Sequence, residues 1–382
     1  DFYYDVPAGF LAPCTDNLSA PEVKLPGDYF NTVLYAGDDG SDRAITVGMQ
    51  PDLVWFKARN AARYHVLIDS VRGGAEIISS NDVAIEVTST GGITSFDSTG
   101  FDVSHDGDWN SLNNSGDNIV TWNWKAGGAP TADNSAGAGA TPTAGSVKID
   151  GSNLGSALAG TIPVLKLSAN TTSGFSIGTY TGNGSRDQTL AHGLSQGPEL
   201  VIVKCYDGPT FNWTVGATPM DNWTDYMHLD TTAAAVDDID FWEDTAPSSS
   251  VITIGPNGNL STTGDDYIFY AFHSVEGYSK VGNYEGNGNA DGVFVYTGFS
   301  PAFVMVKGRD TTDNWTMWDN KRPGRNVTEE ELNADDPAAE SANAPDIDFI
   351  SNGFKRRDTS MNADSGYLYI AFAESPFKTS NA

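Results

Sequence analysis

One seven-residue pattern occurs three times: an apolar run that opens with Pro and closes with Lys. It reads Pro-Asp-Leu-Val-Trp-Phe-Lys at 51–57, Pro-Glu-Leu-Val-Ile-Val-Lys at 198–204 and Pro-Ala-Phe-Val-Met-Val-Lys at 301–307. Pro suits the first position of a strand, where no ladder donor is required. A nearly continuous apolar run is typical of a strand that is covered on both faces. The pattern therefore predicts three central strands in three related units.

Two further motifs accompany each copy at matched distances. A Tyr that leads into a glycine turn (Tyr35, Tyr180 and Tyr284) precedes the closing Lys by 22 to 24 residues. A run of alternating aromatic residues ends each unit, at 120–124, 267–272 and 367–372. A period of two is typical of a strand with one face in the core. From the first Tyr to the last aromatic residue the units span 89, 92 and 88 residues, which suits an antiparallel sandwich of short strands.

We therefore expect an all-β protein of three tandem antiparallel β-sandwich modules, jelly-roll-like and about 90–100 residues each. One helix-like stretch, 328–332, interrupts this pattern as a turn or two within a loop. The chain is expected to consist of the terminal strands of a truncated upstream module (1–30), repeat 1 (31–125), a Gly/Ala/Pro/Thr-rich linker (126–146), a docking segment (147–173), repeat 2 (174–281) and repeat 3 (282–382).

Charge and composition exclude several classes of protein. The 382 residues carry 50 acidic and 21 basic side chains, a formal charge of −29, which would repel both nucleic acid and an anionic membrane surface. No apolar stretch approaches the roughly 18 residues needed to insert into a bilayer. The two cysteines, Cys14 and Cys205, exclude a disulfide framework or a cysteine-based zinc site.

The sequence holds no catalytic motif. Its five histidines show no metal-ligand spacing, and no nucleophile elbow is present. With 50 acidic residues, carboxylate pairs such as Asp346 and Asp348 arise by chance and fall between the strong strands. We therefore expect a protein that is not an enzyme and needs no cofactor. Calcium is a weak alternative, because five aspartates offer hard oxygen ligands without matching a known loop pattern: Asp106, Asp108, Asp237, Asp238 and Asp240.

Tryptophans fall into two groups. Trp122, Trp124, Trp213 and Trp315 recur at matched positions of the repeats and are expected in the core. Four others have no counterpart and sit beside Asp, Asn or Glu in expected loops: Trp109, Trp223, Trp242 and Trp318. Loop tryptophans next to amides and carboxylates are typical of a surface that stacks on sugar rings. These four are the candidate glycan or receptor contacts, and the alternative for each is a plug at the end of a sandwich or at an interface.

Several stretches resemble structural proteins of tailed bacteriophages, especially marine ones. They include Tyr180-Thr-Gly-Asn-Gly184, residues 170–177, 271–280 and 286–299, and the resemblance covers most of 147–380. Residues 9–18 resemble the closing strands of a SPRY-type, lectin-like sandwich that often precedes such modules. The resemblance implies a component of the virion, outside the cell, with no catalytic residues to carry over.

The expected function is that of a non-enzymatic virion structural protein, part of a tail fibre or other appendage that contacts a host-surface glycan. A purely architectural capsid decoration or extracellular filament subunit is the alternative, and a glycan depolymerase is the third. Fibres are commonly trimers, so a homo-oligomer, preferably a trimer, is expected alongside other virion proteins. No nucleic-acid or membrane partner is expected.

Overall fold

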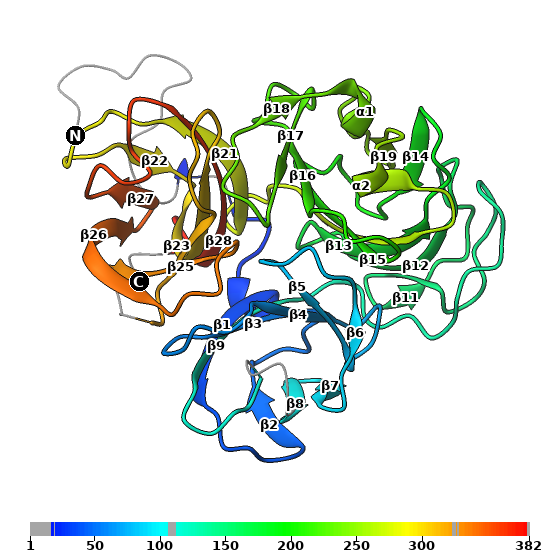
Figure 1. The fold of residues 1–382 in the computed structure, drawn as a ribbon, viewed down its shortest axis with the longest axis horizontal. Helices are drawn as coiled ribbons and strands as arrows, with labels where there is room; N and C mark the ends of the chain where they lie inside the picture. The colour runs from blue at the N-terminus through cyan, green and yellow to red at the C-terminus, as the bar shows by residue number, and fades with distance from the viewer. Residues whose placement is uncertain (1–16, 19, 106–111, 323–325, 327, 380–382) are drawn as a thin grey trace.

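The computed structural model describes residues 17–379, apart from 19, 106–111, 323–325 and 327 and the side chains of 343–345. The chain is built almost entirely of antiparallel β-sheet, so the expected all-β class is confirmed. Figure 1 shows three modules as lobes around a common centre, coloured blue to cyan, green, and yellow to red in chain order. Within the described residues no helix is long and apolar enough to span a membrane.

Module 1 pairs a six-stranded sheet with a three-stranded one. The first and last strands of the module lie side by side in the large sheet, with Phe30 opposite Trp124. The large sheet, in spatial order, is β1 (Phe30–Ala36), β9 (Asn118–Trp124), β3 (Leu53–Ala58), β4 (Val66–Asp69), β5 (Glu76–Ser79) and β6 (Val87–Thr88). The small sheet is β2 (Arg43–Thr46), β8 (Gly100–Ser104) and β7 (Gly92–Asp97), and the 3-10 turn η2 (Pro26–Asp28) precedes β1.

Module 2 repeats this plan and adds three strands at one edge of its large sheet. The added strands come from the segment that precedes the repeat, and one of them, β10, pairs in parallel with β12. The large sheet, in spatial order, is β11 (Ser152–Asn153), β10 (Val147–Ile149), β12 (Val164–Asn170), β13 (Phe175–Thr181), β20 (Asp266–Phe272), β15 (Leu200–Asp207), β16 (Thr214–Ala217), β17 (Asp225–His228) and β18 (Val236–Asp237). The small sheet is β14 (Gln188–Ala191) and β19 (Val251–Ile254), with the short helices α1 (Ile239–Trp242) and α2 (Gly258–Ser261) beside it.

Module 3 forms one eight-stranded sheet that folds back on itself. The spatial order is β21 (Ser279–Glu285), β28 (Gly366–Pro376), β23 (Phe299–Gly308), β24 (Thr316–Asp319), β25 (Thr328–Asn333), β26 (Ser341–Ile350), β27 (Gly353–Arg356) and β22 (Phe294–Tyr296). The expected helical turn at 328–332 is wrong, because this segment is strand β25, in which Thr316 and Met317 of β24 pair with Asn333 and Leu332.

The three Pro-to-Lys runs become the equivalent strands β3, β15 and β23. All but the last two residues of β15 in these strands are buried, since one face packs on the outer sheet of its own module and the other on the centre of the molecule. The central core joins residues of all three modules, among them Trp55, Ile202 and Met305. Three separate outer cores lie inside the individual modules. The modules thus share one core around a pseudo-threefold axis.

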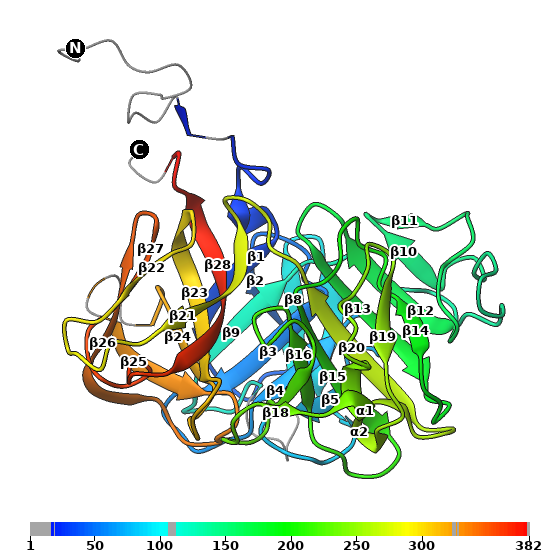
Figure 2. The same cartoon turned by 90° about the horizontal axis from the view of Figure 1, so that it is seen from above.

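Both described ends of the chain lie at one end of this axis. The Lys378 ammonium donates to the carbonyl of Leu18, and the Glu22 amide donates to the carbonyl of Glu276. Figure 2 shows the blue segment before β1 and the red end of β28 on the same side of the molecule. The loops that follow the three closing lysines lie at the opposite end.

Candidate functional site

The structure places the tryptophans proposed as glycan contacts inside the modules. Trp223, Trp242 and Trp318 are at most 1% exposed, so none of them offers a ring face to a sugar. For these three residues the prediction of a surface contact is wrong. The fourth candidate, Trp109, lies outside the described residues. The matched tryptophans Trp122, Trp124, Trp213 and Trp315 are core residues, as expected.

Gly216 and Arg356 line the sites in which these tryptophans are buried. Trp223 and Trp242 meet edge to face at 5.2 Å, over Gly216. A Cβ at Gly216 would come within 2.6 Å of both rings, so the glycine makes room for the pair. In module 3 the guanidinium of Arg356 lies 4.6 Å from the ring centre of Trp318, within the range of a cation–π contact.

The described aspartates among those proposed as calcium ligands do not form a common site. Asp106 and Asp108 lie outside the described residues. Asp238 caps helix α1 by accepting the amide of Asp240, and the Asp240 carboxylate pairs with Arg186. Asp237 lies on the short exposed strand β18. Among the residues that the structure describes, no three His, Cys, Asp or Glu side chains are grouped as a metal site.

The closing Lys of each repeat joins its module to the one that precedes it in cyclic order. Each ammonium donates to a main-chain carbonyl of a neighbouring module, and the direction is the same around the axis. The bonds run from Lys57 to Pro337 at 3.0 Å, from Lys204 to Val83 at 2.8 Å and from Lys307 to Thr232 at 3.0 Å. The three lysines therefore form a closed set of clasps, in which each module holds one neighbour and is held by the other.

Burial sets the electrostatics of these lysine clasps. All three side chains are inaccessible to solvent, and burial lowers the pKa of each to about 8. Each ammonium also donates to carbonyls of its own module, for example Lys204 to Phe211. Each buried ammonium therefore donates to main-chain acceptors on both sides of the interface, where few other donors are available.

A second set of contacts repeats around the axis. The indole nitrogen of Trp213 donates to the carbonyl of Ser79 at 2.8 Å, and that of Trp315 donates to the carbonyl of His228 at 2.9 Å. The equivalent position in module 1 is His65, one residue after the exposed Tyr64. The matched backbone bonds that His65, Trp213 and Trp315 make to the side chains of Asn81, Asp230 and Asp335 establish this equivalence.

His65 is neutral because of its surroundings. Its Nδ1 accepts the indole N–H of Trp55 at 2.9 Å, and its Nε2 is turned toward the main chain of Asn333 without reaching a normal hydrogen bond. Burial, with Lys57 and Arg322 nearby, holds the pKa of His65 well below its usual range. Protonation of Nδ1 would also remove the acceptor of the Trp55 indole N–H and place two donors against each other.

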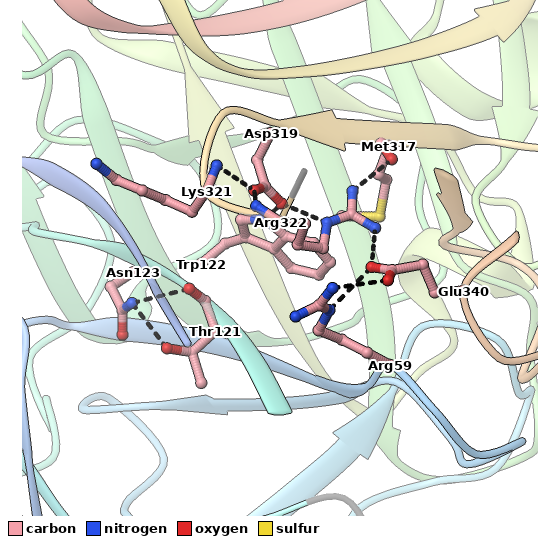
Figure 3. A network of polar contacts seen from close by, with 9 residues as sticks. All are labelled: Arg59, Thr121, Trp122, Asn123, Met317, Asp319, Lys321, Arg322 and Glu340. Carbon is pink, nitrogen blue, oxygen red and sulfur yellow. Dashed lines mark hydrogen bonds and ion pairs between the residues drawn. The ribbon is translucent and has the colours of Figure 1, made fainter. Parts of the chain in front are cut away.

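A buried polar network crosses the interface between modules 1 and 3 (Figure 3). Arg322 donates to Asp319 at 2.7 Å and to Glu340 at 3.1 Å, and Glu340 also binds Arg59 of module 1 through two bonds. The indole nitrogen of Trp122, from module 1, donates to Asp319 at 3.1 Å. The side chains of Asp319 and Arg322 are fully buried, so the Asp319 carboxylate depends on Arg322 as its charge partner.

The interface between modules 1 and 2 carries the same triad. Arg72 pairs with Asp69 and Glu86, each at 2.7 Å, and the hydroxyl of Tyr270 in module 2 donates to Asp69 at 2.9 Å. Tyr270 occupies the position that Trp122 has in module 1. At both interfaces a buried Asp therefore accepts from an aromatic donor of the neighbouring module.

At the third interface, between modules 2 and 3, the triad is replaced by apolar residues. Ala217 and Met220 stand where the other modules have Asp and Arg, and Ala235 stands where they have Glu. The facing residue of module 3 is Ile370, which has no donor. Ala217, Met220 and Ile370 all belong to the central core.

A carboxyl cluster lies inside module 3. Burial, together with the neighbouring carboxyls of Asp358 and Glu331, raises the pKa of Asp346 to about 8, so it holds a proton at neutral pH. Arg356 contacts Asp358 at 3.3 Å. Asp348, two residues along β26, instead pairs with Arg357. The pair Asp346 and Asp348 is thus divided between two environments and does not face a common site.

One groove opens at the end of the axis where the described chain ends meet. It has a volume of about 440 Å³ and is lined by Glu22, Gln196, Lys280, Tyr296 and Lys378, among others. Tyr296 is 58% exposed, and Phe294, two residues earlier on β22, is 48% exposed. These two aromatics were not among the residues expected to bind a ligand, although their alternation with buried Val295 is the signal of an outward-facing pair.

The fold and the interfaces define an all-β protein in which three related modules are clasped around one axis within a single chain. Residues 25–376 match the model of a protein family described as a domain of unknown function, DUF7483, and the chain belongs to this family. Neither the curated proteins nor the solved structures contain a match.

Proposed function

We propose that this chain is a non-enzymatic structural protein of a bacteriophage particle, a component of a tail fibre or another appendage outside the cell. The observation that carries the proposal is the closed set of lysine clasps. It gives the closing Lys of each repeat a structural role, which is to hold the three modules together. The resemblance of 147–380 to virion proteins supports the setting. An architectural role in a capsid or filament is the alternative.

The pseudo-threefold arrangement of the modules favours a monomer over the expected trimer. The threefold unit expected from three chains is supplied by three modules of one chain, and their inward faces are buried against each other. We therefore propose that the chain joins other virion proteins as a single copy that imitates a trimer. Light scattering of the purified chain should give the mass of one chain, and a stable trimer would contradict this part of the proposal.

Purified particles provide the direct test of the setting. Mass spectrometry should detect the chain in particles banded by density, and electron microscopy with a tagged copy should place it on the tail or an appendage. Location on the capsid shell would favour the decoration alternative. Absence from the particles of the phage that encodes the chain would contradict both.

Glycan adhesion is a second candidate, favoured by the exposed pair Phe294 and Tyr296 beside the groove. Aromatic rings spaced two residues apart on an outer strand can stack on successive sugar units. Binding of the labelled chain to host cells should fall at least tenfold in Phe294→Ala/Tyr296→Ala, while Tyr64→Ala, an exposed tyrosine of module 1, should bind normally. Equal binding by both variants would exclude this site.

The non-enzymatic part of the proposal has its own test. We expect no reducing ends to be released when the chain is incubated with host polysaccharide. Release that disappears in Asp346→Asn would establish the depolymerase alternative, because burial raises the pKa of Asp346 to about 8, as a general acid requires.

A further inference from the structure

The first strand of each module lies at the same place in its sheet but differs in what lies beyond it. Strands β1, β13 and β21 are each seven residues long and pair in matching register with β9, β20 and β28. In module 2, β13 is also paired on its other side, where β12 adds an antiparallel strand. Among the described residues, β21 has no strand on that side and ends its sheet.

The main-chain groups of β21 that face this open side can be identified. Gly286 donates to Ser365, and the Val281 amide donates to the hydroxyl of Ser274. Odd-numbered residues of β21 therefore direct their amides and carbonyls away from β28. The corresponding residues of β13 are the ones that pair with β12, and Asn283 corresponds to Thr179, the partner of Lys166.

A groove runs beside this open edge. It has a volume of about 380 Å³, and its walls are residues 280–283 of β21 and the turn of module 2 that contains Thr218 and Pro219. The equivalent turn of module 1, at Val71, faces Leu165 of the added strand β12. The groove is therefore the counterpart in module 3 of the space beside β13 where β12 lies.

We propose that β21 and this groove bind an extended segment of another polypeptide, which adds to the sheet as β12 adds to β13. The main-chain hydrogen bonds of Asn283 and Glu285 would provide the pairing, since both residues are exposed on the open edge. An open edge of this kind is a template for an incoming strand.

The occupant assigned by these observations is a neutral or basic segment of a different protein. A second copy of this chain carries a charge of −29 and would be repelled. Strand β12 shows which residues suit this position. It has a lysine, Lys166, where the segment would face Asn283, and small residues, Ser168 and Ala169, farther along. A segment with alternating apolar and polar residues and one such lysine fits this edge.

A synthetic peptide tests the proposal with the intact chain. The probe is the sequence of residues 162–171, Ile-Pro-Val-Leu-Lys-Leu-Ser-Ala-Asn-Thr, labelled and followed by fluorescence anisotropy. We expect saturable binding, slower hydrogen exchange at residues 283–285 and unchanged exchange at 175–181. Asn283→Pro removes an outward amide and should weaken binding about tenfold or more, whereas Asn283→Gln should bind like the native chain.

Modified peptides keep the test independent of the folding of any variant. In β12 the Leu167 amide points away from β13, toward Ser146, while Lys166 faces β13 opposite Thr179, the counterpart of Asn283. N-methylation at Lys166 should abolish binding, and N-methylation at Leu167 should not. Absence of saturable binding, or equal binding of both peptides, would overturn the proposal. Self-association without peptide that is lost in Asn283→Pro would overturn the assigned occupant in favour of a second copy.

Discussion

Two of the three module interfaces are polar where the third is apolar, although all three have the same geometry. The Asp–Arg–Glu triad faces Tyr270 at one interface and Trp122 at another, while Ala217, Met220 and Ala235 replace it where the facing residue is Ile370. The acceptor is present wherever the neighbour offers a donor, and absent where it does not. The four positions therefore behave as one unit, because a buried charge or donor without its partner is costly.

The largest expected effect comes from breaking one polar triad. Asp69→Ala leaves Arg72 buried without its main partner and Tyr270 without an acceptor, so the free energy of unfolding should fall by about 3–5 kcal/mol. Denaturant unfolding followed by tryptophan fluorescence measures this loss.

A combined variant sharpens the comparison. Asp69→Ala/Arg72→Met/Glu86→Ala with Tyr270→Phe copies the apolar interface and removes the donor without changing its shape. We expect it to recover more than half of the stability lost in Asp69→Ala. A combined variant no more stable than the single one would show that the two kinds of interface are not interchangeable.

The lysine clasps should be equally important at polar and apolar interfaces. Lys204→Met removes the donor of the Val83 and Phe211 carbonyls. Lys307→Met removes the donor of Gly308 and one of the two donors of Thr232, which keeps the Asp313 amide. Each variant should reduce the free energy of unfolding by about 1–3 kcal/mol. Lys321→Met, at an exposed lysine, controls for the loss of charge and should change little. A loss confined to one of the two interfaces would contradict the equivalence.

Alkaline pH gives a smaller effect with a definite sign. The pKa of Lys307 is about 8 in the folded chain and ordinary, near 10.5, in the unfolded chain. Between these values the unfolded chain binds more protons, so stability from this lysine rises with pH. From pH 8 to 10 the native chain should gain about 2 kcal/mol over Lys307→Met in unfolding experiments. A constant difference between the two proteins would contradict the lowered pKa.

Acid should weaken the interface where histidine replaces tryptophan. The pKa of His65 is lowered by folding, so the unfolded chain binds more protons below about pH 6.5, and the stability from neutral His65 falls as the pH falls. His65→Gln can still accept from Trp55 and reach Asn333, but it does not titrate. Between pH 6.5 and 5 the native chain should lose about 1 kcal/mol more than this variant. Parallel pH profiles would contradict this role of His65.

Much of the fold follows from the repeated motifs, while its assembly does not. The Pro-to-Lys runs indicated strands covered on both faces, and β3, β15 and β23 are such strands. A buried face looks the same in sequence whether its own module or a neighbour covers it, so the shared central core could not be foreseen. One signal was available: an Asp-x-x-Arg pattern follows the closing Lys by twelve residues at Asp69 and at Asp319.

The candidate site was harder to predict, because neighbours in sequence are poor guides to exposure. Trp223 sits between Asn222 and Thr224, yet its left-handed backbone conformation, with φ of 75°, belongs to a turn that directs the ring inward. The exposed pair Phe294 and Tyr296 instead belongs to a short strand with an ordinary alternating pattern. Which member of an alternating pair faces solvent is fixed by the packing of the sheet.

The clasp between Lys57 and Pro337 joins residues 280 positions apart in the chain. At ribosomal rates of about 5–20 residues per second, module 1 emerges roughly 14 to 56 seconds before its partner is synthesised. During that interval module 3 is not yet present to cover Trp122, which packs on Phe303 of that module. This protein therefore most needs a chaperone while module 1 is newly made. Completion of module 3 ends the exposure.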